Sequence, residues 1–328
     1  MQSPLQLAHP SRQLRQGELY ALQLRLHPQE AGQVAANAGP HIQAAFLDLV
    51  RQLDPALAKD LHTPNQRRPY TLGMLQGFNT LTVEQQIAAL NHGETLTVSP
   101  GQVYWLRMTM LDDTVLDTFM RALLWKAQGL IFCIGETPFA VSRIVTRPET
   151  PGQGSAWVAS SSFTALHHLA EARASYHFEF HSPTVFSLGN RTWGKYLHLF
   201  PEPANVFESL AMQWEQFAPQ SLRLAADQLT PRTIGQWCAE NVVASRYTLT
   251  TCHLSARRFG QVGFQGTILY DVKGKRHAPE ARWLSTLARF AFFSGVGYKT
   301  AMGMGQSRCL SLPQACTLEG DRQEGSEP

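Results

Sequence analysis

The sequence predicts an α+β protein built from two tandem ferredoxin-like domains, with a glycine-rich loop near the C-terminus. The strand–helix–strand–strand–helix–strand order of this fold can be traced twice along the 328 residues. A stretch rich in Gly, Pro and Ser at 150–162 separates the two copies and is typical of a linker. We therefore expect domains at 14–150 and 163–315, followed by a disordered, acidic tail at 316–328.

The predicted first domain begins with a strand and two helices. Period-two alternation over 18–27 indicates a half-buried strand. An apolar stripe at i, i+3, i+4 and i+7 predicts an amphipathic helix over 41–53. A shorter helix is expected over 55–61, with Asp54 as its N-cap and Pro55 at its first position.

The remaining elements of the first domain follow in ferredoxin-like order. Extended structure is expected over 69–75, followed by a long insertion around 79–97. A strand over 103–110, a helix over 112–126 and one or two strands over 130–146 then complete the pattern.

The pattern starts again after the linker, although no sequence repeat accompanies it. The expected elements are a strand at 174–181, a helix at 203–217, paired strands at 246–254 and 263–272, a helix at 281–293 and a final strand at 306–312.

Composition restricts the classes of protein that fit. No apolar run reaches membrane-spanning length, and the N-terminus lacks the apolar core of a signal peptide. The five cysteines are scattered and form no C-x-x-C pair, so we expect a reducing cytoplasm and neither disulfides nor a zinc site. The pair His167/His168 has no third ligand at suitable spacing. His177 and His181 share one face of a strand and could form half of a metal site, but packing in the core or at the surface is the more common role, so no metal or other cofactor is expected. A net charge of +3 permits nucleic-acid binding without indicating it.

A glycine-rich segment between the last helix and the last strand is the most informative part of the sequence. Its candidate binding residues are Gly295, Gly297, Tyr298, Lys299, Thr300, Gly303, Gly305 and Arg308. Backbone N–H groups in such turns can form an anion-binding nest. The helix–glycine–strand order is the reverse of that in Rossmann and Walker loops, so a nucleotide cofactor is disfavoured. A helix C-terminus repels anions, so an anion bound here would have to be held by backbone amides together with Lys299 or Arg308.

This segment resembles the C-terminal glycine-rich motif of the sixth CRISPR-associated (Cas) family. Members of that family are RAMP-type endoribonucleases that cut CRISPR precursor RNA within its repeats. Further similarity lies in 180–186 (F-H-S-P-T-V-F), in 199–203 before a helix with Trp214, and in 54–62 with the R-R-P-Y-T that follows. The resemblance implies RAMP domains and a repeat RNA as partner. Other CRISPR-associated proteins of an effector or adaptation complex, and a second copy of the chain, are further expected partners.

The resemblance also assigns catalytic candidates. His62 matches the family's catalytic histidine, and Arg68 matches a lysine six residues later, with Arg67 expected to assist it as a phosphate clamp. The tyrosine that some members use falls at Leu47, which cannot transfer a proton. The general base therefore stays open among His62, His41 and Tyr70. From the residues alone, a histidine at a helix end is more often a capping or surface residue.

Basic residues beside aromatic ones in the second half suit RNA, because aromatic rings stack on bases while cations bind phosphates. An ordinary solvated surface is the alternative. The clusters are Arg191 and Lys195 around Trp193, Arg257 and Arg258 before Phe259, and Lys273, Lys275 and Arg276 in a hairpin-like turn.

The sequence thus predicts a metal-independent endoribonuclease that cleaves CRISPR repeats by attack of a 2′-hydroxyl. Its products would carry a 2′,3′-cyclic phosphate and a 5′-hydroxyl. The alternative that Leu47 suggests is a RAMP subunit that holds guide RNA without cutting it. A nucleotide-binding metabolic enzyme is disfavoured by the order of elements around the glycines.

Overall fold

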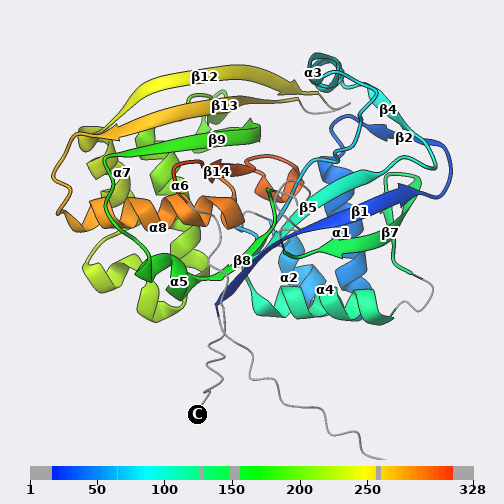
Figure 1. Ribbon diagram of the computed structural model, residues 1–328, viewed down its shortest axis with the longest axis horizontal. Helices are drawn as coiled ribbons and strands as arrows, with labels where there is room; N and C mark the ends of the chain where they lie inside the picture. The colour runs from blue at the N-terminus through cyan, green and yellow to red at the C-terminus, as the bar shows by residue number, and fades with distance from the viewer. Residues whose placement is uncertain (1–16, 65, 126–128, 148–155, 256–259, 313–328) are drawn as a thin grey trace, which may run out of the picture.

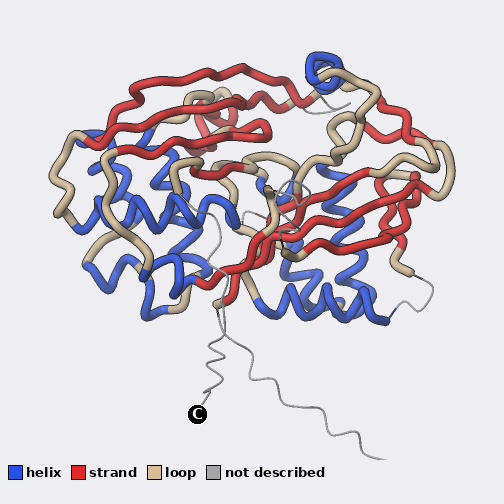
Figure 2. Tube along the Cα trace, viewed as in Figure 1, coloured by secondary structure: helices blue, strands red, loops and turns tan. Residues whose placement is uncertain are grey.

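The computed structural model describes residues 17–64, 66–125, 129–147, 156–255 and 260–312. Two antiparallel sheets stand side by side, and most helices pack beneath them in the view of Figures 1 and 2. The predicted tail from 316 onward, most of the predicted linker, and Arg257 and Arg258 lie outside the described residues.

The N-terminal sheet has the strand order β3-β5-β1-β7-β6, with β8 also paired to β1. The order β3-β5-β1-β7 is that of a ferredoxin-like sheet, which confirms the predicted fold of this half. The end of the predicted linker is a strand instead, because its serines pair with the start of β1. The strands are β1 (Glu18–Pro28), β3 (Tyr70–Leu72), β5 (Tyr104–Met110), β6 (Ile131–Ile134), β7 (Thr137–Val145) and β8 (Ala159–Ser162).

Three helices cover one face of this sheet (Figure 1): α1 (Gly39–Leu53), α2 (Pro55–His62) and α4 (Asp113–Trp125). Asp54 caps α2 as predicted, since the Leu57 N–H donates to its Oδ1 over 2.9 Å. The apolar stripe of α1 packs into the N-terminal core through Ile42, Phe46 and Val50. This packing fixes where α2, and therefore His62, emerges.

The predicted insertion is ordered structure. It contributes the helix α3 (Val83–His92) and the strand β4 (Thr95–Val98), which pairs with β2 (Gly32–Ala35). The end of α3 contacts the other half of the molecule: the Ser255 hydroxyl donates to the Asn91 carbonyl, and the His253 N–H donates to the Asn91 side chain over 2.7 Å.

The C-terminal sheet repeats the same order as β12-β13-β9-β14, so the second predicted ferredoxin-like unit is also confirmed. A hairpin, β10–β11, and the helix α7 were not predicted. The strands are β9 (Ser175–Thr184), β10 (Phe186–Arg191), β11 (Gly194–His198), β12 (Val242–Leu254), β13 (Gln261–Val272) and β14 (Ser307–Cys309). The helices are α5 (Phe163–His168), α6 (Pro203–Phe217), α7 (Pro231–Asn241) and α8 (Pro279–Ser294), with 3-10 turns η1 (Gln220–Leu222), η2 (Leu224–Asp227) and η3 (Thr300–Met302).

A buried arginine on β5 joins the two halves at the end of α8. Arg107 donates from its NH2 nitrogen to the Phe292 carbonyl over 2.6 Å and from Nε to the Trp157 carbonyl over 2.9 Å. The Thr109 hydroxyl donates to the next carbonyl of the helix, that of Phe293, over 2.6 Å. These donors satisfy carbonyls that a helix end leaves unpaired. The N-terminal sheet therefore fixes the point at which α8 gives way to the glycine-rich loop.

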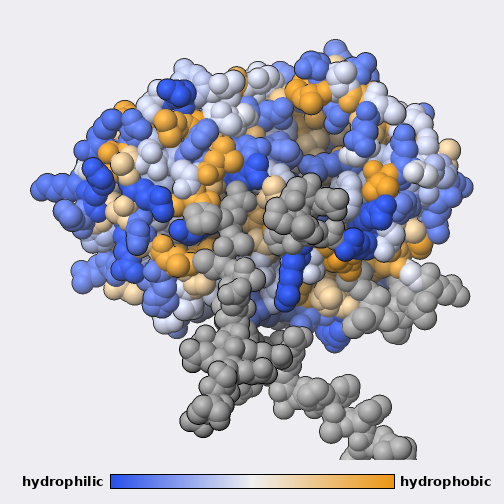
Figure 3. Space-filling view, in the orientation of Figure 1, coloured by the Kyte–Doolittle hydropathy of each residue, from blue (hydrophilic) through white to orange (hydrophobic). Residues whose placement is uncertain are grey.

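Surface character adds little about function. Hydrophilic residues prevail toward the outer edges of the face shown in Figure 3, with apolar residues interspersed. No helix in the described part of the chain is long and apolar enough to cross a bilayer.

Candidate functional site

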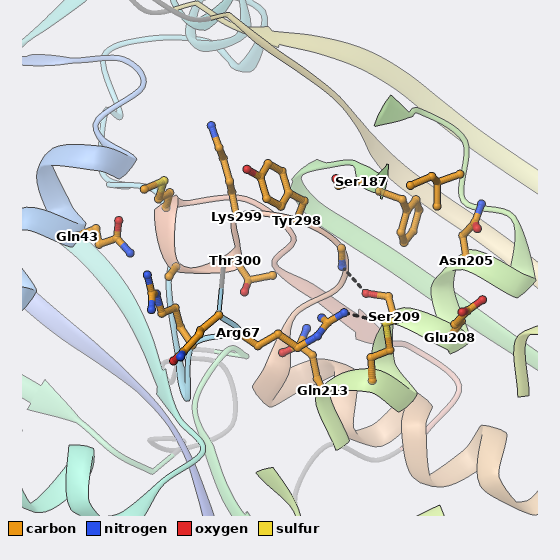
Figure 4. A pocket seen from close by; sticks show the side chains of 18 of the residues that line it. Gln43, Arg67, Ser187, Asn205, Glu208, Ser209, Gln213, Tyr298, Lys299 and Thr300 are labelled. Carbon is orange, nitrogen blue, oxygen red and sulfur yellow. Dashed lines mark hydrogen bonds between the residues drawn. The ribbon is translucent and has the colours of Figure 1, made fainter. Parts of the chain in front are cut away.

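A cleft of about 530 Å³ lies between the two halves, and Figure 4 shows it from close by. Residues from α1, from α2 and the loop after it, from β10, from α6 and from the glycine-rich loop form its walls. They are Gln43, His62, Gln66, Arg67, Arg68, Phe186, Ser187, Leu188, Asn205, Glu208, Ser209, Met212, Gln213, Gly297, Tyr298, Lys299, Thr300, Ala301 and Met302. The predicted histidine–arginine segment and the predicted glycine-rich loop thus meet in one cleft.

The wall from the N-terminal half carries an imidazole and two guanidinium groups. His62 is the last residue of α2, and its side chain is exposed. The Arg67 NH2 nitrogen donates to Sδ of Met212 on α6 over 2.9 Å, so this arginine reaches across the cleft. Desolvation by the surrounding protein lowers the pKa of the Arg67 guanidinium, although solvent still reaches the side chain. Arg68 lies beside it and is half-buried.

The glycine-rich loop does not form the anion-binding nest that the sequence suggested, because most of its amides already have protein acceptors. Val296 N–H donates to Gly305 O, Gly303 N–H to Leu72 O, and Gly305 N–H to Pro183 O, over 2.8 to 3.0 Å. The Gly297 N–H donates to the Ser209 hydroxyl over 3.2 Å, which Figure 4 shows as a dashed line. The glycines shape the loop, and an anion would be bound by its side chains.

All four glycines of the loop have positive φ: 64° at Gly295, 86° at Gly297, 88° at Gly303 and 73° at Gly305. Close approach also requires them, since a Cβ on Gly305 would lie 2.2 Å from the Val296 carbonyl oxygen. These bends hold η3 against the N-terminal half.

The side chains that the loop presents are aromatic and cationic. Lys299 has φ of 60°, an uncommon conformation for a residue other than glycine. Its Nζ lies 5.6 Å from the centre of the Tyr298 ring. Lys195 of β11 also donates to the Tyr298 hydroxyl over 2.8 Å, with its Nζ 4.2 Å from the ring centre. Two ammonium groups from different elements thus gather at one ring.

Helix α6 supplies a polar wall that the sequence analysis did not identify. Its buried stripe packs into the core of the C-terminal half, while Asn205, Glu208, Ser209, Met212 and Gln213 share the face toward the cleft. Their spacing of i, i+3, i+4, i+7 and i+8 places them on one face of the helix, and this is the signal by which the sequence could have revealed the wall. When a helix is considered only for the face that it buries in the core, the opposite polar face is easily taken for ordinary surface.

The three candidates for a general base lie in different surroundings. Tyr70 is fully buried against Phe46, and burial raises the pKa of its hydroxyl, which accepts a hydrogen bond from Gln43 over 3.3 Å. His41 is outside the cleft lining, beside Gly135 of the β6–β7 turn. Only His62 lines the cleft. Leu47 packs against the N-terminal core, and Gln43, one turn earlier on α1, takes the position at the cleft.

Arg308 does not reach the cleft. Its Nε donates to Oε2 of Glu179 over 2.6 Å, and its guanidinium lies 4.5 Å from the centre of the Trp157 ring. The His181 ring and, secondarily, Arg308 lower the pKa of Glu179 against the opposing effect of burial. Arg308 thus forms an ion pair outside the cleft, and its predicted contact with RNA stays untested.

The other basic clusters divide by position. Arg191 and Lys195 lie on the β10–β11 hairpin next to the glycine-rich loop, with Arg191 5.4 Å from the centre of the Tyr196 ring. Lys273, Lys275 and Arg276 lie in the connection from β13 to α8, not in a hairpin turn. A 16-residue helix is about 24 Å long, so α8 separates this cluster from the glycine-rich loop at its far end. Their predicted contact with RNA would therefore lie away from the glycine-rich loop, and it stays a prediction.

Fold and site together define a class: an α+β protein with two RAMP-type ferredoxin-like units and a basic cleft between them. Two family models match the chain, the Cas6 N-terminal domain over residues 19–168 and the CRISPR-associated endoribonuclease Cas6 over residues 178–307. The chain belongs to the Cas6 family.

Comparison with individual proteins agrees. The chain is 25% identical to a Cas6 endoribonuclease of Streptococcus thermophilus over 38% of this chain and 46% of that protein. It is 26% identical to one of Mycobacterium tuberculosis over 46% of this chain and 44% of that protein. It thus spans about half the length of the curated relatives it matches. A solved Cas6 product complex covers 90% of this chain with a TM-score of 0.70 and 24% identity, and a Thermus thermophilus Cas6 covers 90% with 0.62 and 22%. Those structures are matched over 100% and 99% of their lengths.

Proposed function

We propose that this protein is an endoribonuclease that cleaves CRISPR precursor RNA within its repeats and needs no metal ion to do so. The observation that carries the proposal is that His62, Arg67 and Arg68 line the same cleft as Lys299 and Thr300. An imidazole beside several cations is the equipment that RNA self-cleavage needs. Similarity to Cas6 structures solved with RNA product or a substrate mimic supports a repeat RNA as the substrate.

In the proposed reaction the 2′-hydroxyl of the nucleotide before the cut attacks the adjacent phosphorus. A new 2′-O–P bond forms as the bond from phosphorus to the 5′-oxygen breaks. His62 carries the proton transfer, either by accepting the 2′-hydroxyl proton or by protonating the leaving 5′-oxygen, and water takes the complementary part. Arg67 and Arg68 neutralise the charge that grows on the phosphate oxygens. Lys299 and Lys195 hold the backbone of the RNA so that the attack is in line.

Cleavage of the repeat RNA from the associated CRISPR array, measured in EDTA, tests this proposal. We expect one cut, with a 2′,3′-cyclic phosphate or its hydrolysed form and a 5′-hydroxyl, and no cut when the attacking 2′-hydroxyl is replaced by hydrogen. His62→Ala should abolish cutting while RNA affinity stays within a few fold. His41→Ala is the matched control and should cut normally. Activity that EDTA removes and magnesium restores would refute the metal-independent mechanism.

The proposal extends to the setting of the reaction. The scattered cysteines fit a reducing cytoplasm, where precursor RNA is made. The mature guide RNA would pass to other CRISPR-associated proteins, and a homodimer stays a prediction. Light scattering of the protein with and without repeat RNA would measure the number of copies in the complex.

A second function, guide-RNA binding without cleavage, is favoured by one observation. Tyr70 is buried and His41 lies off the cleft, so His62 has no second imidazole or phenol of the predicted set beside it. Analysis of the RNA after binding separates the two functions. A pure binder returns the repeat intact after prolonged incubation, whereas an endoribonuclease returns two defined fragments.

A further inference from the structure

The cleft carries two polar side chains on α6 that the proposed reaction does not use. Asn205 and Glu208 lie on the side of the cleft away from Gln43 and Arg67, as Figure 4 shows. Ser209 and Met212, on the same face of α6, are already engaged by the Gly297 N–H and by Arg67. Within the described residues, no hydrogen bond or ion pair holds the side chain of Asn205 or of Glu208.

Chemistry restricts what an acidic side chain can bind in a cleft built for RNA. A carboxylate repels phosphate, so it can contact RNA only through N–H groups of a base or a ribose hydroxyl. Burial raises the pKa of Glu208, while Arg232 on α7 lowers it. Its Oε2 rests near Gly235 of α7, where a Cβ would lie only 2.7 Å away. The half-buried Glu208 carboxylate has no hydrogen-bond donor among the described residues, so a base edge could supply two N–H donors in place of solvent.

From this geometry we infer that Asn205 and Glu208 form a subsite that reads a guanine base near the scissile phosphate. This inference rests on the proposed function, since it assumes that RNA occupies the cleft. Guanine is the base whose Watson–Crick edge offers two adjacent donors, N1–H and the N2 amino group, and these match the two oxygens of one carboxylate. The Asn205 amide can donate to guanine O6 beside them.

The other three bases fit less well. Adenine and cytosine present a ring-nitrogen acceptor next to their amino group, and uracil presents one N–H between two carbonyls, so each would set an acceptor against the carboxylate. Leu188, which is 42% exposed, provides apolar surface in the cleft, against which the plane of a base can pack. Met212 lies seven positions after Asn205 on α6, which is about 10 Å along the helix. The subsite is therefore offset from Arg67 and suits a neighbouring nucleotide.

Binding of short RNAs tests the subsite separately from cleavage. The probes are the heptanucleotides UUUGUUU, UUUAUUU, UUUCUUU and UUUUUUU, with a fluorescent label, measured by anisotropy in EDTA with the full chain. We expect the guanine probe to bind about 5- to 150-fold more tightly than the adenine probe, the range of one good bidentate contact. An inosine probe, which lacks the N2 amino group, should fall between them.

Variants then assign the preference to the two residues. Glu208→Gln should reduce the guanine-to-adenine ratio to near one and remove the difference between guanine and inosine. Asn205→Ala should weaken the binding of the guanine probe without affecting that of the all-uracil probe. Glu240→Gln, a matched change on the exposed face of α7, should preserve the wild-type ratio. Equal binding of the guanine and adenine probes, or an unchanged ratio in Glu208→Gln, would overturn the inference.

The outcome is separable from that of the proposed function. A protein that cuts its repeat but shows no guanine preference keeps the nuclease proposal and loses the subsite. A protein that prefers guanine through Glu208 but leaves repeat RNA intact keeps the subsite and loses the nuclease proposal.

Discussion

Replacement of Gly39 by alanine should separate the assembly of the cleft from its chemistry. Gly39 is the first residue of α1 and lies directly under η3 of the glycine-rich loop. A Cβ at this position would lie 1.9 Å from the Met302 carbonyl oxygen and 2.6 Å from its carbon. Gly39 is not among the glycines with positive φ, so the backbone itself accepts alanine. The effect of the substitution is therefore a purely steric one.

The size of the displacement follows from these distances. Ordinary van der Waals contact begins at 3.4 Å, so the loop and α1 must separate by about 1.5 Å. Overpacking of this kind costs about 1–3 kcal/mol of stability. Displacement of positioning groups by about 1 Å can lower a rate roughly 100-fold. We expect Gly39→Ala to unfold at lower urea and to cleave repeat RNA about 100-fold more slowly under single-turnover conditions.

The matched control is Gly260→Ala. This glycine also has no positive φ, and no atom of the residues that the structure describes lies within 4 Å of the added Cβ. Its urea midpoint and cleavage rate should equal those of the wild type. If Gly39→Ala also cleaves within twofold of the wild type with the same urea midpoint, the rigid seating of the loop on α1 is not what aligns the cleft.

Three further predictions follow from single contacts. Because Lys299 has φ of 60°, Lys299→Gly should raise the free energy of unfolding by up to about 1 kcal/mol, and Lys299→Ala should not. Both variants should reduce the slope of log affinity for RNA against log salt concentration by about 0.7. An unchanged slope would exclude a phosphate contact. Arg107→Met leaves two buried carbonyls without donors and should destabilise the protein by about 2–4 kcal/mol in urea denaturation. Arg107→Lys should restore part of this stability. If Arg107→Met is as stable as the wild type, the contact between the two halves is dispensable. Since burial raises the pKa of Glu208, the guanine preference should decline on acidification before an ordinary carboxyl is protonated, and a preference that is constant from pH 7 to pH 4.5 would contradict this.

Local patterns were enough to predict both sheets and most of their helices. Alternation over 18–27 and the apolar stripe over 41–53 correspond to β1 and α1, because each element buries one face. Helix α7 was missed although Thr230 and Pro231 are a good N-cap and first-turn pair, since its apolar residues are few. Strand β8 was missed because three consecutive serines are typical of loops, and only its pairing with β1 makes them a strand.

The candidate site was predicted in part. Its histidine and arginines follow from the resemblance in 54–68, and the structure brings them to the loop as the sequence suggested. The amides of Gly303 and Gly305 are not free to bind an anion because they donate to the carbonyls of Leu72 and Pro183, more than one hundred residues away. No local sequence pattern reveals these acceptors. The distance of Lys273 from the cleft likewise depends on which end of α8 faces the N-terminal half.

The glycine-rich loop owes its shape to main-chain bonds, to the absence of side chains at four glycines and to the packing of Thr300 beside Gly295 and Gly305, whereas the Lys299 side chain only approaches the Tyr298 ring, with its Nζ 5.6 Å from the ring centre. Replacement of the Lys299 side chain is therefore cheap for the scaffold but consequential for whatever nucleic acid rests on it. A lineage could retune the loop to a diverging repeat through this position, with the frame of the cleft left intact.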